Sequence, residues 1–324
     1  VRAMNAVLAP AGERLMPGAM HPWMAPVAET RLWPHGQTEI YQAYHRIFDC
    51  RHHGWANLQS MHVNLPFSSD AEFARLHAAL RLLLPILPAL AASSPVADGA
   101  ASGCADTRMQ VYRHNADAFP AITGALIPEP VTGSADYRAH ILQPMYDAIA
   151  PVDPRRVLRH EWLNSRGAIA RFERNAIEVR VLDMQECPQA DVAIAAAVVA
   201  LAQWLYRGAA VEHAGFATER LARVFDACVR AGGDAAIDDA GYLALWDFPA
   251  PRAVAFELWQ HLLERIPAHD LPPDARALLD TIVCEGTLAQ RLLRALDGDL
   301  RRPHLRAVWS ELCDCLQQGK QFTP

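Results

Sequence analysis

The residues best suited to do chemistry lie on two short segments in which polar and apolar side chains alternate. In the sequence IEVRVLD, Glu178 and Arg180 alternate with apolar residues, so in a strand both charges lie on one face. In the sequence SMHVNLP, His62 and Asn64 alternate with apolar residues in the same way. If the two strands are sheet neighbours, four polar groups gather at one place. Each pair alone is equally compatible with a solvated surface or a structural ion pair.

Gathered on one sheet face, these four groups suit a charged ligand. Carboxylate oxygen is the preferred ligand of Mg²⁺ or Mn²⁺, which also accept imidazole as a minority ligand. We therefore predict that His62 and Glu178 bind a metal ion that bridges phosphate groups. Asn64 is predicted to hold a nucleotide by hydrogen bonds, and the Arg180 guanidinium to bind a carboxylate or phosphoryl oxygen.

Further arginines precede this strand. The segment NSRGAIARFER brings Arg166, Arg171 and Arg174 upstream of the acidic residue, and we expect Arg171 on the neighbouring strand and Arg174 in solvent. Converging guanidinium groups beside a metal ion indicate a polyanionic ligand. The small residues of ASSPVADGAASGCADTR would let backbone amides approach phosphates, with Arg108 as a further nucleotide contact.

The elements that must position these residues follow from periodicity. We predict a strand from residue 58 that ends at Pro66, and further strands at 155–163, 168–172 and 176–182. A buried helix interrupted by Pro85 and Pro88 follows the first strand. Other helices are predicted at 37–50, 136–150, 191–207, 217–231, 238–247, 252–265, 273–282, 287–296 and 303–317.

This layout predicts an α+β fold, in which an antiparallel sheet is backed by helices and the C-terminal part is mostly helical. We expect residues 1–190 to form the sheet-and-helix region and residues 191–324 a helical region packed on it within the same domain.

Composition excludes several classes of protein. With a net charge of −6 and almost no lysine, the chain is not expected to bind nucleic acid or an anionic membrane. Its seven cysteines are scattered and odd in number, which argues against a disulfide framework and for a reducing compartment. The longest apolar stretch, 192–202, is too short to span a bilayer. We therefore predict a cytoplasmic protein.

The order of several motifs resembles the second class of glutamate–cysteine ligases, which are carboxylate–amine ligases. The motifs are MHPWM, GWANLQSMHVNLPF, LLLPILPALAASSP, ITGALIPE, EWLNSRGAIARFER and AIEVRVLDMQECPQADVAI. The resemblance implies a catalytic sheet like that of glutamine synthetase. It also implies that ATP, with Mg²⁺ or Mn²⁺, phosphorylates the γ-carboxylate of glutamate, and that an amine such as cysteine displaces the phosphate.

By this resemblance, His62 and Glu178 lie where the family has metal ligands, and Asn64 lies near the nucleotide. Arg171 and Arg180 lie where arginines contact the amino-acid carboxylate and the phosphoryl group, and are the predicted catalytic residues. We expect Glu178→Gln to abolish metal-dependent turnover with little change in thermal stability, whereas a large loss of stability would identify Glu178 as half of a structural pair.

One departure from the family concerns the metal site. Family members open with a strand that carries closely spaced glutamates, and no segment before His21 fits that description. We therefore expect an incomplete metal site, through absence of the opening segment or loss of ligands, and an exposed sheet edge that favours a homo-oligomer. A catalytically incomplete protein that binds nucleotide or amino acid, and a metal-dependent hydrolase, are the alternatives.

Overall fold

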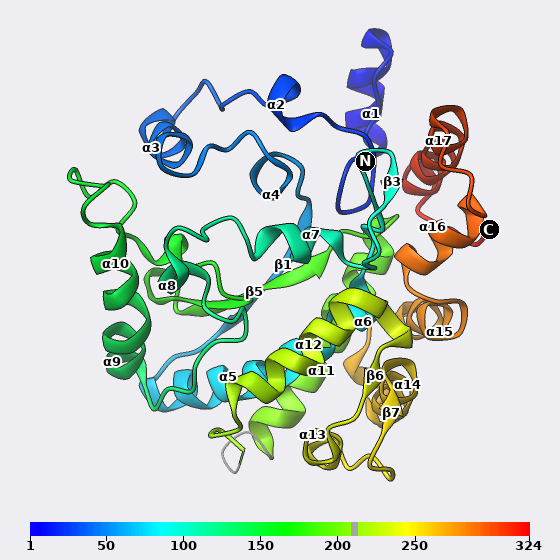
Figure 1. The fold of residues 1–324 in the computed structure, drawn as a ribbon. Helices are drawn as coiled ribbons and strands as arrows, with labels where there is room; N and C mark the ends of the chain where they lie inside the picture. The colour runs from blue at the N-terminus through cyan, green and yellow to red at the C-terminus, as the bar shows by residue number, and fades with distance from the viewer. Residues whose placement is uncertain (209–212) are drawn as a thin grey trace.

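The centre of the molecule is a small antiparallel sheet. The computed structural model describes residues 1–208 and 213–324. Its sheet has the strand order β1-β5-β4, with β1 at Ser60–Pro66, β5 at Ala176–Asp183 and β4 at Ala168–Arg171 (Figure 1). The predicted α+β class and the antiparallel sheet are confirmed.

The register of the sheet separates its polar and apolar side chains. Val63 lies opposite Val179 and Asn64 opposite Glu178, while Ile169 on β4 also lies opposite Glu178. Because successive side chains of a strand point to opposite faces, the valines lie on one face and the polar residues on the other. The predicted pairing of the two polar segments is confirmed.

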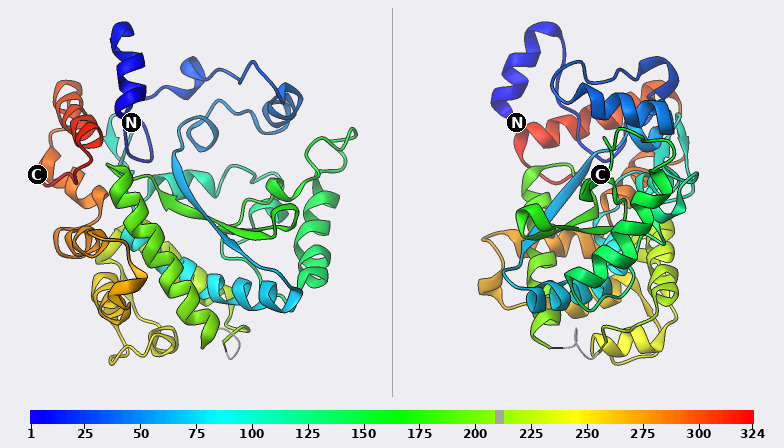
Figure 2. Two further views of the ribbon diagram at one scale, coloured as in Figure 1. Left: turned by 180° about the vertical axis from the view of Figure 1, so that it is seen from behind. Right: turned by 90° about the vertical axis from the view of Figure 1, so that its left-hand side faces the viewer.

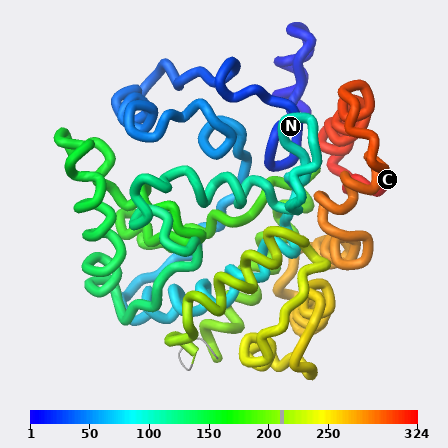
Figure 3. Tube along the Cα trace, in the orientation of Figure 1, coloured from blue at the N-terminus to red at the C-terminus, as the bar shows by residue number. Residues whose placement is uncertain are grey.

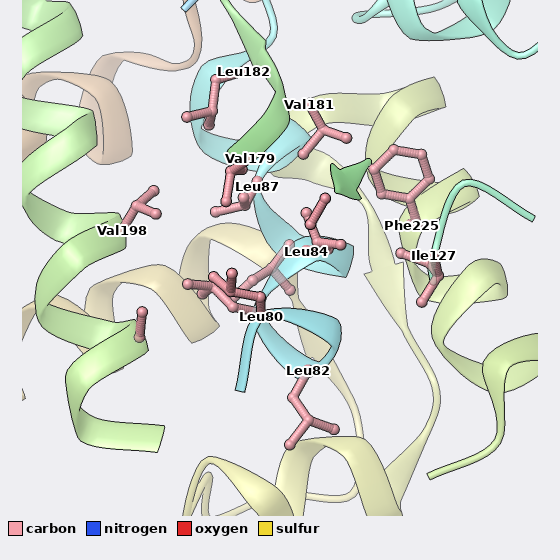
Figure 4. Packing of buried hydrophobic residues seen from close by; sticks show 14 of the residues in the cluster. Leu80, Leu82, Leu84, Leu87, Ile127, Val179, Val181, Leu182, Val198 and Phe225 are labelled. Carbon is pink, nitrogen blue, oxygen red and sulfur yellow. The ribbon is translucent and has the colours of Figure 1, made fainter. Parts of the chain in front are cut away.

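The apolar face rests on a layer of helices. Helix α5 (Asp70–Leu83), the 3₁₀ turn at Leu84–Ile86 and α6 (Pro88–Ala91) follow β1 and form the predicted buried, proline-interrupted helix. Helices α11 (Pro188–Arg207) and α12 (Thr218–Ala231) complete the layer. Figure 4 shows side chains from strand β5 and from these helices packed together, including Val179, Leu84 and Val198. This packing fixes the sheet so that its polar face is free to form a site.

Helix α11 is apolar enough, by length and composition alone, to be a candidate membrane span. In the structure its Ile194, Val198 and Leu205 are fully buried in the core. Its apolar character is therefore explained by packing inside the protein.

The other elements surround this centre. The segment with α2 (Pro26–Glu29), α3 (Thr38–Phe48) and α4 (His53–Ala56) covers the opposite side of the sheet from α5, as Figure 1 and the rear view in Figure 2 show. Short elements complete the N-terminal half: α1 (Arg2–Leu8), the hairpin β2 (Val96–Ala97) and β3 (Ala100–Ala101), α7 (Thr107–Tyr112), α8 (Pro120–Thr123), α9 (Ser134–Tyr137) and α10 (Gln143–Ile149).

The C-terminal part is helical, as predicted. It comprises α13 (Ala240–Leu245), α14 (Ala255–Arg265), α15 (Ala275–Glu285), α16 (Leu288–Leu296) and α17 (Arg302–Gln318), with a short pairing of β6 (Ala236–Ile237) and β7 (Ala253–Val254). The chain trace in Figure 3 brings α1 back beside α17, where Asn5 donates a hydrogen bond to Gln317 at 2.7 Å. One hydrophobic cluster runs from Ala43 to Ile282, so the two predicted regions share a core, while the boundary at residue 190 stays a prediction.

The strand predicted at 155–163 is wrong. The segment turns instead, because the Asp153 carboxylate accepts hydrogen bonds from the backbone N–H groups of Val157 and Leu158 at 3.0 and 2.8 Å. Only a 3₁₀ turn at Glu161–Leu163 follows before β4. The helix predicted at 136–150 is confirmed, since α9, a π-helical turn at Arg138–Leu142 and α10 follow one another without a break.

The N-cap of α5 supports a first test of the fold. The Ser69 hydroxyl accepts a hydrogen bond from the backbone N–H of Glu72 at 3.2 Å. We expect Ser69→Ala to lower the free energy of unfolding by about 1 kcal/mol, because one N–H of the first turn loses its acceptor. Urea unfolding measures this difference. Ser69→Asp, which keeps an acceptor, should match the native protein, and equal losses in both variants would show that capping is not the cause.

Candidate functional site

The polar face of the sheet carries a cluster of charged groups centred on Glu178. Its Oε1 accepts a hydrogen bond from Arg180 Nε at 2.7 Å, and its Oε2 accepts one from Arg171 Nη1 at 2.9 Å. His62 Nδ1 lies 3.4 Å from Oε1. The structure thus brings together residues from all three strands, as the sequence analysis expected for His62, Glu178 and Arg180.

Burial distinguishes the members of this cluster. The Glu178 side chain is only 6% exposed, whereas that of His62 is 39% exposed. Burial alone would raise the pKa of Glu178, and it is the largest single influence, but hydrogen bonds from His62 and Arg180 together hold the pKa well below its usual range. Glu178 is therefore ionised, and His62 faces solvent beside it.

Arg180 is held on more than one side. Besides its contact with Glu178, its Nη1 donates to the backbone carbonyl of Asn164 at 3.1 Å. Burial lowers the pKa of Arg180, but the neighbouring Tyr112 and the Glu178 carboxylate raise it more, so the net pKa is raised. The guanidinium is thus a fixed positive charge at the base of the polar face.

Asn64 lies at the edge of the same face. It is exposed and sits opposite Glu178 in the strand register. Among the described residues its side chain has no hydrogen-bond partner, and its place on the free edge strand β1 leaves its amide open to a ligand. Its predicted role toward a nucleotide stays a prediction.

The donor set limits which metal site is possible. In the part of the chain that the structure describes, no three His, Cys, Asp or Glu side chains come close enough to hold an ion together. His62 and Glu178 offer two ligand groups, and two guanidinium groups stand beside them. This set fits a divalent ion whose remaining ligands are phosphate oxygens and water, and it does not fit a cation bound by protein alone.

The sequence analysis predicted Arg108 as a nucleotide contact, but the structure places its side chain in the interior of the protein. Its side chain is 3% exposed and forms an ion pair with Asp183, and its Nη1 donates to the Arg180 carbonyl at 3.2 Å. Asp183 also accepts hydrogen bonds from Ser93 N and Ser94 Oγ, both at 2.8 Å. The guanidinium therefore anchors the loop to the end of β5, and the prediction that Arg108 contacts the nucleotide is wrong.

The remaining arginines of the segment before β5 are outside the cluster. Arg166 forms a bidentate pair with Glu129 through hydrogen bonds of 2.6 and 2.7 Å. Arg174 is exposed, as expected. Only Arg171 joins the site.

A group of aromatic residues beside Arg180 was not predicted as part of the site. The Tyr44 ring lies 4.9 Å from that of Trp55 and 5.9 Å from that of Trp162, between centroids. Trp162 precedes Asn164, whose carbonyl binds Arg180. The apolar spacing along α3 indicated that Tyr44 faces the protein interior. Nothing in that spacing indicated that Tyr44 lies near the charged cluster.

Comparisons with known proteins agree with these motifs. The family model described as Glutamate-cysteine ligase family 2 matches residues 1–311. An uncharacterized protein of Archaeoglobus fulgidus is 40% identical over 190 residues, which make up 59% of this chain and 51% of that protein. The chain thus spans about half the length of the curated relative that it matches.

Proposed function

Since this chain belongs to glutamate–cysteine ligase family 2, we propose that it is an ATP-dependent carboxylate–amine ligase that forms a γ-glutamyl amide bond. The convergence of Arg171, Arg180 and His62 on Glu178 is the observation that supports this most strongly. The proposal includes a catalytic sheet of the glutamine synthetase kind, glutamate and an amine such as cysteine as substrates, a cytoplasmic location and a homo-oligomeric state.

The proposed reaction has two steps. ATP transfers its γ-phosphoryl group to the γ-carboxylate of glutamate, and the amine then attacks the acyl phosphate and releases phosphate. Both steps place negative charge on oxygen atoms, which fixed cationic donors stabilise. Arg171 Nε is buried and has no hydrogen-bond partner among the described residues, so this guanidinium carries an unpaired donor next to its contact with Glu178. We assign Arg171 and Arg180 to the phosphoryl and carboxylate oxygens.

The metal is proposed to bind with the nucleotide. His62 and Glu178 would hold a Mg²⁺ or Mn²⁺ ion, which when bound would neutralise phosphate oxygens. Because two guanidinium groups adjoin these ligands, a bare divalent cation is repelled and needs the phosphates as ligands.

This leads to a prediction on metal affinity. We expect titration calorimetry to show no Mg²⁺ binding to the protein alone at millimolar concentration, and Mg²⁺-dependent binding of ATP. His62→Ala should weaken the binding of Mg²⁺-ATP by about tenfold, since one of two protein ligand groups is lost. His269→Ala, which changes an exposed histidine of the C-terminal part, is the control. Tight Mg²⁺ binding without nucleotide would contradict the proposed ligand set.

The activity itself is tested with a small nucleophile. Hydroxylamine intercepts acyl phosphates, so glutamate, ATP, Mg²⁺ and hydroxylamine should yield γ-glutamyl hydroxamate and one phosphate per turnover. Absence of both products would contradict the ligase.

One observation favours a second candidate function. Among the described residues no three His, Cys, Asp or Glu side chains could hold a metal ion together, which fits a protein that binds nucleotide or amino acid without turnover. ATP binding that is indifferent to Mg²⁺, together with no hydroxamate, would identify it.

A further inference from the structure

A hollow of about 700 Å³ opens on the side of the sheet covered by α2, α3 and α4. Its wall includes four aromatic side chains, Trp33, Tyr41, Tyr44 and Trp55. Hollows of this size with apolar walls and few polar groups are typical of small-molecule sites.

Two of these aromatic side chains are unusually open to solvent. Trp33 is 56% exposed and Tyr41 is 39% exposed, although both line the hollow. Tyr44 and Trp55 are held in place by packing, with Trp55 also 5.5 Å from the ring of Phe48. Exposed aromatic side chains above a fixed aromatic wall provide faces on which a flat ligand can stack.

Aromatic side chains connect the wall of the hollow to the surroundings of Arg180. Tyr44 lines the hollow and contacts Trp162, and Trp162 precedes the residue whose carbonyl binds Arg180. Burial, the larger effect, raises the pKa of Tyr44, while the nearby positive charge of Arg180 lowers it. Tyr44 therefore belongs both to the wall of the hollow and to the surroundings of the guanidinium.

The direction of the strands places the hollow opposite the proposed nucleotide contact. Trp55 and Ala56 line the hollow and precede β1, whereas Asn64 lies near the far end of that strand. Between them, His62 and Arg180 occupy the middle of the polar face. An amine attacks the acyl carbon from above or below the plane of its carbonyl group, whereas the phosphate lies in that plane. The amine and the nucleotide therefore need separate places beside the acyl group, and the two ends of the face suit two different substrates.

We propose that this hollow binds the amine substrate and selects a primary amine that carries a flat aromatic ring. The proposal rests on the ligase function proposed above. The amine nitrogen forms a bond to the γ-carbonyl carbon of glutamyl phosphate as the bond from that carbon to the phosphate oxygen breaks. The phosphate leaves with the bonding electrons and takes up the proton that the nitrogen loses.

The walls favour an aromatic amine over a small one. The side chain of cysteine would leave most of the aromatic surface in contact with water, whereas a ring would bury it. The ring would stack on Tyr44 and Trp55 and be covered by Trp33, with the nitrogen lone pair directed toward the acyl carbon.

The test compares amines in one assay of γ-glutamyl amide formation. We expect benzylamine and phenethylamine to give values of kcat/KM at least about tenfold above those of ethylamine and cysteine, as stacking between rings would produce. Trp33→Ala should remove most of this preference by raising the KM for the aromatic amines and leaving the KM for ATP unchanged. Because Trp33 is exposed, this variant is expected to fold.

Two further variants sharpen the result. Trp55→Phe keeps a ring in the wall and should retain the preference. Trp204→Ala removes a partly exposed tryptophan on α11, far along the chain from the hollow, and should behave as the native protein.

The outcomes separate this inference from the function on which it rests. If hydroxamate forms but aromatic amines are not preferred, the inference is overturned and the ligase stands. If Trp33→Ala raises the KM for ATP in place of that for the amine, the hollow binds the adenine base and the inference is overturned. If no hydroxamate forms, the ligase function fails and the inference with it.

Discussion

Replacing Glu178 with alanine is expected to lower the free energy of unfolding by about 3–5 kcal/mol and to abolish ligase turnover. The carboxylate is the shared partner of two buried guanidinium groups, at 2.9 Å from Arg171 and 2.7 Å from Arg180. Its removal leaves two positive charges close together without a carboxylate partner among the described residues. The sequence analysis predicted Glu178 as a metal ligand and expected Glu178→Gln to change thermal stability little. The two ion pairs add a structural role, for which the alanine variant is the stronger test.

Glu178→Gln should cost less, since the amide keeps the shape and one acceptor of the carboxyl group. It should also change the acid dependence of stability. Because the pKa of Glu178 is lowered on folding, its contribution is complete above about pH 5, the region above the usual pKa of a free glutamate, and is lost as the pH falls toward the folded value. The native protein should therefore lose stability on acidification more steeply than the variant.

Urea unfolding at pH 7 and at pH 4 measures both effects. Asp314→Ala is a matched control, because Asp314 forms a 2.8 Å pair with Arg14 but its side chain is 58% exposed. Such surface pairs contribute between zero and about 1 kcal/mol. A loss of less than about 1 kcal/mol for Glu178→Ala would show that the two guanidinium groups find other partners and that the pair is not structural.

The polar face could be predicted from the sequence because one rule determines it. Alternation with a period of two assigns His62, Asn64, Glu178 and Arg180 to one face, and the register confirms that Asn64 lies opposite Glu178. The register shifts between Met61 and Val63, as in a β-bulge, and the contacts of His62 and Arg180 with Glu178 place these two side chains in the same cluster. The helices after residue 188 were also predictable, since each has an apolar face with helical spacing.

The errors have two causes, contacts between residues distant in the sequence and a local contact between a side chain and the backbone. Arg108 was predicted as a nucleotide contact because its acceptor, Asp183, lies 75 positions further along the chain and comes beside it only in the folded protein. The segment at 155–163 has apolar residues suited to a strand, but the Asp153 carboxylate binds its backbone in a turn. The hollow could not be predicted either, since Trp33 and Trp55 belong to separate segments that only the fold brings together.

The second large effect is expected for Arg180→Lys, with kcat/KM reduced about 100- to 1,000-fold, nearly as much as by Arg180→Ala. Arg180 donates through Nε to Glu178 at 2.7 Å and through Nη1 to the Asn164 carbonyl at 3.1 Å, which fixes the plane of its guanidinium. A lysine ammonium cannot make both contacts in this fork geometry and still present a donor to a phosphoryl oxygen.

Steady-state kinetics of hydroxamate formation measure this loss. Thermal unfolding must be measured alongside the kinetics. A variant that is folded but inactive shows that the guanidinium of Arg180 acts in catalysis as well as in the ion pair with Glu178. Arg174→Lys, at an exposed arginine of the same segment, should retain full activity. If Arg180→Lys stays within about threefold of the native kcat/KM, a loss no larger than that of a typical exposed ion pair, positive charge alone is sufficient at this position. The site would then act on its ligand by Coulombic attraction without the bidentate geometry that a phosphoryl group in transfer requires.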